Sequence, residues 1–215
     1  MAVGMIVHMP NIRLLCLHGY HGSADIMRRQ LGPLIDGLDV PVEFVYVDAP
    51  SLAVGDFGWW HLNFQGWERT RDWAVDLFER EPRFDGVFGF SQGAALTALL
   101  VGMRAPDGVV TEQRPLSFDF AMMASGFRSD SAIHSGLFAN RDSFALPSLH
   151  MMSTSDPIVA TRDSRVLAEQ FHAPLVLEHA NGHVIASTPP IREQVARFLA
   201  KMHDNRYHET GVTNS

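Results

Sequence analysis

The stretch Gly89-Phe90-Ser91-Gln92-Gly93 constrains the fold of this 215-residue chain more than any other feature. It follows an apolar, strand-like segment, 84–88, and precedes an apolar, helix-like segment, 94–101. A G-x-S-x-G turn between a strand and a helix is so sharp that its serine is pushed toward positive φ, at a cost of about 1–3 kcal/mol. Glycine at both ends leaves room for this turn. The pattern therefore predicts a nucleophile elbow, which exposes the Ser91 hydroxyl at the carboxyl edge of a sheet.

Segments typical of strands alternate with segments typical of helices along the whole chain. The predicted strands are short, rich in β-branched or aromatic residues and bounded by Gly, Pro, Asp or His. They span residues 12–17, 42–47, 84–88, 118–124, 148–152 and 174–178. Apolar side chains at helical spacing predict further helices over 70–78 and 191–202. Such alternation indicates a parallel sheet with helices on both faces. We predict a compact α/β-hydrolase fold with six parallel strands in the order 2-1-3-4-5-6 and no large separate lid domain.

Length and composition fit one domain with a substantial core. Apolar residues make up 46% of the chain and charged residues 19%. We expect a single domain over residues 1–203, followed by a polar, disordered tail over 204–215. The net charge of −7 argues against binding to nucleic acid or to an anionic membrane surface.

The cysteine content and the hydropathy pattern bear on the compartment. The chain has one cysteine, Cys16, which excludes an internal disulfide framework and suits a reducing environment. Because Cys16 lies between two leucines in a predicted strand, we expect a buried core residue rather than a nucleophile. We expect neither a signal peptide nor a transmembrane helix, since no basic segment precedes an apolar run and no run approaches eighteen apolar residues. These features favour a cytoplasmic protein.

A serine hydroxyl becomes a useful nucleophile when a base removes its proton and an acid orients that base. In the predicted fold these residues follow in the order Ser, Asp or Glu, His, each just past a strand end. Asp156 follows the strand at 148–152, and His183 follows the strand at 174–178. The sequence therefore predicts Ser91 as nucleophile, His183 as base and Asp156 as the orienting acid.

Three other residues compete for these roles. His179 also follows the last predicted strand, although it reads as the end of that strand, whereas Gly182 gives the loop before His183 freedom to turn inward. Asp130 and Asp163 are alternatives for the acid. The position of Asp163 favours the first turns of a helix, where the helix dipole stabilises a carboxylate.

The oxyanion hole requires two backbone amides. One is expected from Gln92, at the start of the helix after the elbow. The loop after the first strand, Leu17-His18-Gly19-Tyr20-His21-Gly22-Ser23, enters the site from a neighbouring strand, and we predict that the Tyr20 amide is the second donor. His18 is expected to order this loop by hydrogen bonding. His18 and His21 have no carboxylate or cysteine partners at ligand spacing, so no metal site is expected.

Two long segments follow strand ends, where ligands bind in open α/β sheets. They span 49–67 and 125–146, and both carry aromatic residues among small or polar ones. Long loops at such positions are usually functional. We predict that these segments wall an apolar acyl pocket, with Trp59, Trp60 and Phe127 as substrate-binding residues.

The chain resembles the FSH-type serine hydrolases over about residues 12–200. The resemblance rests on the block through Ser91 and on shorter motifs that fall in the same order: Leu17-His18-Gly19, Gly58-Trp59-Trp60, Ser125-Gly126-Phe127, Asp156-Pro157 and Gly182-His183. It implies a small α/β-hydrolase with a Ser-Asp-His triad at Ser91, Asp156 and His183 and with no cofactor. Members are similar to carboxylesterases and thioesterases, and some release acyl chains from polyketide synthases. The chain departs from the commonest pattern at Val47-Asp48-Ala49-Pro50 and in the approach to the two tryptophans, which bears on substrate preference.

The sequence thus predicts hydrolysis of carboxylic esters or thioesters of apolar acyl groups through an acyl-enzyme. Two alternatives stay open. One is a dedicated thioesterase that releases an acyl chain from an acyl carrier or polyketide synthase. The other is a non-catalytic binding protein on a hydrolase scaffold, because a fold alone does not establish an activity.

Overall fold

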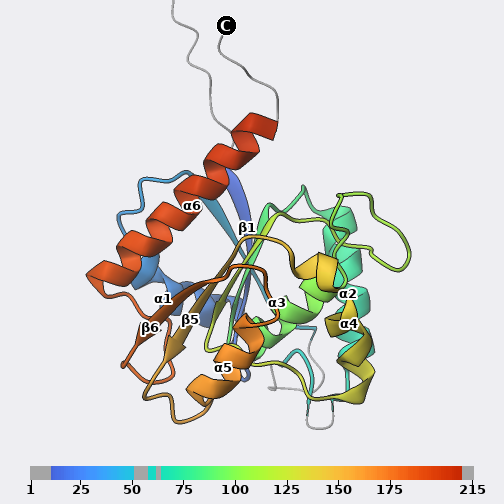
Figure 1. Ribbon diagram of the computed structural model, residues 1–215, viewed down its shortest axis with the longest axis horizontal. Helices are drawn as coiled ribbons and strands as arrows, with labels where there is room; N and C mark the ends of the chain where they lie inside the picture. The colour runs from blue at the N-terminus through green and yellow to red at the C-terminus, as the bar shows by residue number, and fades with distance from the viewer. Residues whose placement is uncertain (1–10, 51–57, 62–63, 210–215) are drawn as a thin grey trace, which may run out of the picture.

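The computed structural model describes residues 11–50, 58–61 and 64–209, and its centre is a six-stranded parallel sheet (Figure 1). The strands are β1 (Ile12–Leu17), β2 (Val42–Val47), β3 (Gly86–Phe90), β4 (Phe120–Ala124), β5 (Ser148–Ser153) and β6 (Leu175–His179). Their order is β2-β1-β3-β4-β5-β6, and every neighbouring pair is parallel. The predicted fold class and strand order are confirmed.

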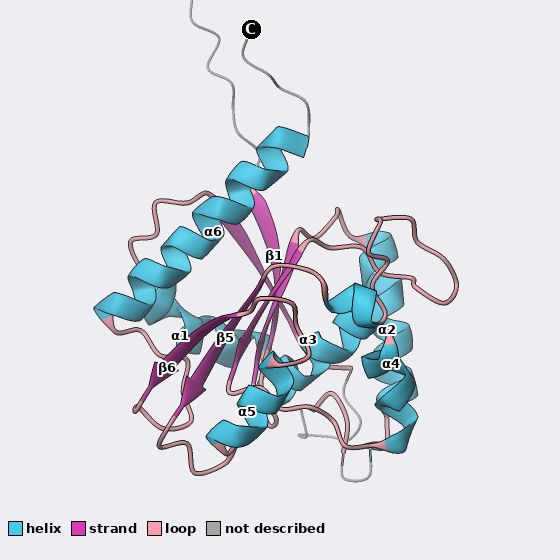
Figure 2. Ribbon diagram, viewed as in Figure 1, coloured by secondary structure: helices cyan, strands magenta, loops and turns pink. Residues whose placement is uncertain are grey.

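Helices cover both faces of this sheet. They are α1 (Ala24–Ile35), α2 (Trp67–Arg80), α3 (Gln92–Gly102), α4 (Ser135–Ala139), α5 (Thr161–Ala168) and α6 (Pro189–Glu209). Helices α1 and α6 pack on one face, while α2, α3 and α5 contribute to the core on the other (Figures 1 and 2). This two-layer covering is what a sheet of nearly continuous apolar strands requires.

Alternate residues along each strand divide the core into two halves. In β1, Leu15 and Leu17 belong to the half that contains α3, whereas Leu14 and Cys16 belong to the half that contains α1 and α6. This follows from the two-residue period of a strand. Burial raises the pKa of the Cys16 thiol, so this group stays protonated within the core. The described position of Cys16 agrees with its expected role as a buried core residue.

Helix α3 is buried along its whole length, because it lies against the sheet and is covered in turn by other elements. All of its residues, Gln92 to Gly102, are buried. A helix that is apolar on every side belongs inside a protein. The elbow therefore passes from the centre of the sheet directly into the centre of one core half.

The third and fourth strands begin two residues later than predicted, at Gly86 and Phe120. At the third strand the reason lies at Asp85, whose carboxylate accepts hydrogen bonds from the Arg13 amide and from the side chains of Arg83 and Arg206. These bonds hold Asp85 at the amino edge of the sheet, before the β3 pairing starts. At its other end, β3 extends to Phe90, the residue before Ser91.

The tail predicted over 204–215 is wrong for residues 204–209, because α6 continues to Glu209. Its last turns are held by tertiary contact: the Arg206 guanidinium lies 2.7 Å from the Asp85 carboxylate, 121 residues away in the chain. Sequence periodicity carries no information on such a contact. Residues 210–215 lie outside the described residues. Within the described residues, no helix is both long and apolar enough to cross a membrane.

Candidate active site

The nucleophile elbow, residues 89–93, brings Ser91 to the carboxyl edge of the sheet. Ser91 has φ 55° and ψ −117°, so its φ is positive as predicted for the sharp turn. It occupies the N-cap position of α3. A Cβ at residue 89 would overlap the backbone of Gly93, and a Cβ at residue 93 would overlap the carbonyls of Leu17 and His18. Both positions therefore require glycine because of close backbone approach. The Ser91 hydroxyl makes no capping bond to its own helix, which leaves it available to another partner.

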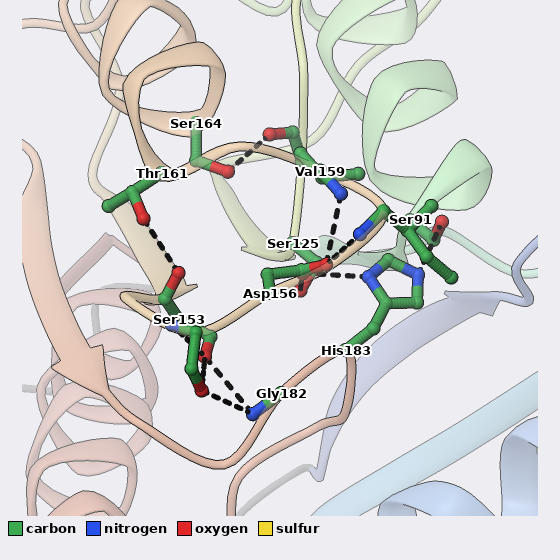
Figure 3. Close-up of polar contacts among 12 residues, drawn as sticks. Ser91, Ser125, Ser153, Asp156, Val159, Thr161, Ser164, Gly182 and His183 are labelled. Atoms are coloured by element: carbon green, nitrogen blue, oxygen red, sulfur yellow. Dashed lines mark hydrogen bonds and ion pairs between the residues drawn. The ribbon is translucent and has the colours of Figure 1, made fainter.

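The structure brings Ser91, His183 and Asp156 into one hydrogen-bonded series (Figure 3). The Ser91 Oγ lies 3.0 Å from His183 Nε2, and His183 Nδ1 lies 2.7 Å from Asp156 Oδ2. Because a carboxylate only accepts hydrogen bonds, Nδ1 carries the imidazole proton. The lone pair of Nε2 then faces the serine hydroxyl, which is the arrangement that a general base requires.

The Asp156 carboxylate is held by four donors. Its Oδ1 accepts the amides of Ile158 and Val159 at 2.8 and 2.9 Å, and its Oδ2 accepts His183 Nδ1 and the Ser125 hydroxyl. Burial raises the pKa of Asp156, but the hydrogen bonds from Val159, His183, Ile158 and Ser125 outweigh burial and lower the pKa below its ordinary value. Asp156 is therefore ionised at neutral pH and able to stabilise an imidazolium.

The loop that carries His183 is tied to the loop that carries Asp156. The Gly182 amide donates to the hydroxyls of Ser153 and Ser155, at 3.2 and 3.1 Å (Figure 3). The Thr154 amide donates to the His179 carbonyl at 2.8 Å. Gly182 has φ +77°, a conformation that strains residues with a side chain. These contacts give the imidazole a fixed place relative to the carboxylate.

The competing residues take other positions. His179 is the last residue of β6, and its Nδ1 accepts the Asn181 amide. Asp163 lies in the first turn of α5, as predicted, and is half exposed. Asp130 is exposed. The His183 imidazole, by contrast, also packs on the Phe90 ring, with 4.9 Å between the ring centroids.

The two predicted oxyanion donors both lie beside Ser91. Gln92 opens α3, where the first amides of a helix have no intrahelical acceptor. Tyr20 lines the same cavity as Ser91, and the neighbouring Gly19 approaches so closely that a Cβ there would lie 3.3 Å from Ser91 Cβ. Among the residues that the structure describes, neither the Tyr20 nor the Gln92 amide has a backbone acceptor.

His18 orders the loop that carries Tyr20, in the way its position suggested. Its Nε2 accepts the Ala49 amide at 3.1 Å, so its Nδ1 carries the proton and donates to the Gly19 carbonyl at 2.7 Å. Burial lowers the pKa of His18, although the bond to Gly19 and the charge of Asp48 oppose this shift. The ring is neutral and acts as a hydrogen-bonded brace within the core.

A cavity of about 580 Å³ opens beside Ser91. Apolar side chains make up much of its wall, and acidic groups and Arg128 lie among them. The lining residues are Tyr20, Phe64, Ser91, Gln92, Phe127, Arg128, Ser129, Asp130, Ile158, Val159, Asp163 and Val166. A larger hollow of about 1050 Å³ lies between α2 and residues 110–115, and Ser91 is not among its lining residues. The cavity at Ser91 has the size of a small-molecule site.

The structure places two of the three predicted wall residues elsewhere. Phe127 lines the cavity, but Trp59 is fully buried and Trp60 nearly so, and neither is among the lining residues. The reason is the Gln92 side chain, which accepts the Trp59 amide at 3.0 Å and donates to the Trp60 carbonyl at 2.9 Å. These bonds hold the backbone of both tryptophans beside α3. The Trp59 indole also donates to the His18 carbonyl at 2.7 Å, and both rings pack in the core, with Trp60 against Phe64. The prediction that Trp59 and Trp60 face the acyl group is therefore corrected.

Several residues at the site were missed by the sequence analysis. Ile158 and Val159 lie two and three residues after Asp156, and Val166 lies on α5 and is 44% exposed. The apolar pair Ile158 and Val159, so close after the predicted acid, was a signal that could have been used. Phe90, whose ring packs on His183, was also missed, although it lies inside the elbow motif itself.

The sequence and the fold are similar to those of known proteins. The family model described as Serine hydrolase (FSH1) matches residues 7–195. An Anopheles gambiae protein, Esterase AGAP003155, is 32% identical over 211 residues, which cover 87% of this chain and 77% of that protein. The Caenorhabditis elegans protein Esterase C25G4.2 is 31% identical over 218 residues, which cover 92% of this chain and 96% of the nematode protein.

A similar solved structure is that of Zea mays acyl-protein thioesterase 2. It superposes with a TM-score of 0.67 and 17% sequence identity, covering 92% of this chain and 96% of the maize chain. Such a likeness concerns the fold alone. The family match and the two esterase relatives carry the further conclusion: the chain belongs to the FSH1 serine hydrolase family and is an α/β-hydrolase enzyme that hydrolyses esters.

Proposed function

We propose that this enzyme hydrolyses carboxylic esters and thioesters of apolar acyl groups, with Ser91 as nucleophile, His183 as general base and acid, and Asp156 as the orienting acid. The single observation that carries the proposal is the continuous series from Ser91 Oγ through both nitrogens of His183 to Asp156 Oδ2, with distances of 3.0 and 2.7 Å. Each distance is within the range for proton transfer or orientation.

In the acylation step, His183 Nε2 takes the proton of Ser91 as Oγ attacks the acyl carbon. The negative charge that develops on the acyl oxygen is stabilised by the amides of Gln92 and Tyr20. The ionised Asp156 holds the Nδ1–H tautomer and stabilises the imidazolium. His183 Nε2 then gives its proton to the departing alcohol or thiol, which leaves an ester between Ser91 and the acyl group.

Deacylation repeats these steps with water. Water gives a proton to His183 Nε2 and attacks the acyl carbon, and the oxyanion returns to the same two amides. Collapse of this intermediate breaks the bond to Ser91 Oγ, which recovers the proton from His183. The products are the free carboxylic acid and the resting enzyme, so no cofactor takes part in this proposed cycle.

The cavity supports the preference for an apolar acyl group. Phe64, Phe127, Ile158, Val159 and Val166 give it apolar walls next to Ser91. The inclusion of thioesters is supported by the described function of the maize thioesterase with a similar fold. A cytoplasmic location is part of the same proposal, and the single, buried cysteine supports it.

Covalent labelling tests the nucleophile directly. A fluorophosphonate probe should label Ser91, and Ser91→Ala should abolish labelling and lower kcat by about five to six orders of magnitude while the protein stays folded. Mass spectrometry of the digested adduct identifies the site. An adduct on another residue, or ordinary esterase activity in Ser91→Ala, would overturn the assignment.

A substrate panel then separates the open alternatives. p-Nitrophenyl esters and acyl-thioesters of matched and graded chain length should both be hydrolysed, with the highest kcat/KM for apolar acyl groups. Exclusive turnover of carrier-bound thioesters would favour a dedicated thioesterase acting on an acyl carrier. Binding of acyl compounds without labelling or turnover would favour a binding protein.

A further inference from the structure

We propose that Ser125 is a positioning residue of the active site: its hydroxyl orients the Asp156 carboxylate toward His183 and fixes the acid and histidine loops relative to the nucleophile elbow. This inference rests on the proposed catalytic roles of Ser91, His183 and Asp156. Ser125 does not itself meet the substrate, since it is 1% exposed and lies outside the cavity lining.

Ser125 lies at the junction between the elbow and the acid. It directly follows β4, which pairs with β3 on one side and β5 on the other. The Ser91 amide donates to the Ala124 carbonyl at 2.9 Å, and the Ser125 amide donates to the Met151 carbonyl at 2.9 Å. Two adjacent residues of one strand end thus contact the nucleophile segment and the acid-bearing strand.

The Ser125 hydroxyl reaches the one carboxylate oxygen that also binds the base. It donates to Asp156 Oδ2 at 2.9 Å, and His183 Nδ1 donates to the same atom at 2.7 Å (Figure 3). The other oxygen, Oδ1, is held by two amides of the acid's own loop. The carboxylate is therefore fixed at both ends, and Ser125 supplies the anchor that comes from a different strand.

The backbone of Ser125 is strained in a way that points to its side chain. Its φ is +48°, in the region that favours glycine, and a residue with a side chain there costs about 1–3 kcal/mol. Glycine would relieve this strain. A serine at this position therefore indicates that the hydroxyl contributes something that glycine cannot.

The acid and histidine loops are bonded to each other, so the Ser125 bond to Asp156 also helps to position His183. Gly182 binds Ser153 and Ser155, and Thr154 binds His179, so both loops share cross-links behind the imidazole. These bonds fix His183 relative to Asp156 but do not involve the elbow. The bond from Ser125 to Asp156 connects the two loops to the strand end that holds Ser91.

Loss of the hydroxyl has two predictable chemical effects. The Oδ2 end of the carboxylate keeps its bond to His183 but loses its fixed direction, so the distance between Ser91 Oγ and His183 Nε2 varies and kcat falls. The charge on Oδ2 is also shared with one donor fewer, which favours the protonated imidazole. The acid limb of the kcat/KM profile should then move to higher pH, because a higher pH is needed to free the base.

The test compares Ser125→Ala with Ser125→Gly. Both remove the hydroxyl, but only Gly relieves the backbone strain. We expect both variants to lower kcat about 10-fold, with KM unchanged within about twofold, and to move the acid limb in the same direction. Ser125→Gly should be the more stable of the two. Should Ser125→Ala fail to fold, Ser125→Gly carries the kinetic test, since its backbone fits the observed φ.

A matched control is Ser143→Ala. Ser143 is also a fully buried serine, and its hydroxyl donates to the Arg104 carbonyl at 2.9 Å, outside the acid and histidine loops. This variant should lose stability without any shift in the pH profile. It therefore separates a general loss of stability from a specific effect on Asp156.

The outcomes distinguish the two levels of the proposal. If Ser91→Ala keeps ordinary activity, the proposed function fails. If Ser91→Ala is inactive while both Ser125 variants keep the wild-type kcat and pH profile, the positioning role of Ser125 alone is wrong. Recovery of full activity in Ser125→Gly, or failure of both variants to fold, would assign Ser125 a purely structural role and overturn the inference.

Discussion

The nucleophile side of the active site and the acid–histidine side are held by different kinds of contact. The elbow is fixed by backbone packed against backbone: the carbonyls of Leu17 and His18 occupy the space that a side chain at residue 93 would need. The loops of Asp156 and His183 are fixed by hydrogen bonds that involve side chains: the Ser125 hydroxyl donates to Asp156, and the Ser153 and Ser155 hydroxyls accept the Gly182 amide.

This difference separates stability from chemistry. Packed backbone cannot shift to make room for an added side chain, so a substitution at Gly89 or Gly93 should damage the fold and the activity together, whereas Ser91→Ala adds no atom. A single side-chain hydrogen bond contributes about 0.5–1.5 kcal/mol, or somewhat more when one partner is charged, so we expect its loss to leave the fold intact. Changes on the acid–histidine side should therefore alter the reaction while the protein remains folded.

The largest effect is expected from Gly93→Ala. The added methyl group would overlap the Leu17 carbonyl in a fully buried region, so we expect a loss of more than about 4 kcal/mol in the free energy of unfolding, or no folded protein. Thermal unfolding followed by circular dichroism measures this. Gly136→Ala is the control, since a Cβ there meets nothing within 4 Å. A Gly93→Ala protein as stable as the control would contradict the claim that packed backbone fixes the elbow.

The next effect concerns the reaction alone. Asp156→Asn keeps the size of the side chain but removes the charge and favours the wrong imidazole tautomer, so kcat should fall by about four orders of magnitude. The variant should still fold, because an amide oxygen can accept the amides of Ile158 and Val159. Steady-state kinetics with thermal unfolding on the same sample checks both statements. Unfolding of Asp156→Asn would contradict the separation of stability from chemistry.

The smallest expected effect is on how the free energy of unfolding depends on pH. The elbow strand and its helix, residues 86–102, contain no ionisable side chain, whereas β5, which leads to Asp156, contains His150. Burial lowers the pKa of His150 to about 3. The unfolded chain binds a proton near the ordinary value of about 6.5, so this contribution to stability is complete above pH 6.5 and is lost as the pH falls toward 3. The slope is about 1.4 kcal/mol per pH unit from this group.

Urea unfolding at pH 7, 5.5 and 4 measures this slope in the wild type and in His150→Leu. The variant should be less sensitive to acid, although some slope should remain, because burial also lowers the pKa of His18, His134 and His179. Below about pH 4 the Asp156 carboxylate adds a second loss, since its pKa is lowered in the folded protein. If the free energy of unfolding depends on pH equally in both proteins, His150 does not cause the loss of stability in acid.

The sequence was informative wherever a short segment determines the geometry. The elbow can be read from glycine spacing, and the strand order follows from the α/β-hydrolase pattern that the elbow indicates. Asp156 and His183 were placed by one rule, that parallel strands end at a common edge. These inferences need no knowledge of which distant side chains meet.

The sequence was uninformative where distant contacts decide. Trp59 and Trp60 were expected at the cavity because they are aromatic and follow a strand end, but contacts with Gln92 and His18, more than thirty residues away, hold them in the core. The end of α6 depends in the same way on the contact between Arg206 and Asp85. Residue type and spacing do not reveal such pairs, so the cavity wall and the length of α6 required the structure.

The placement of the cavity wall has an evolutionary consequence. Tyr20, Ile158 and Val166 are 44%, 70% and 44% exposed, so they contribute little to the core. Mutations at these positions can change which molecules the enzyme accepts while leaving its folding largely unaffected. Substrate preference can therefore diverge by changes at the rim of the cavity, while the glycine pair beside Ser91 tolerates no added side chain.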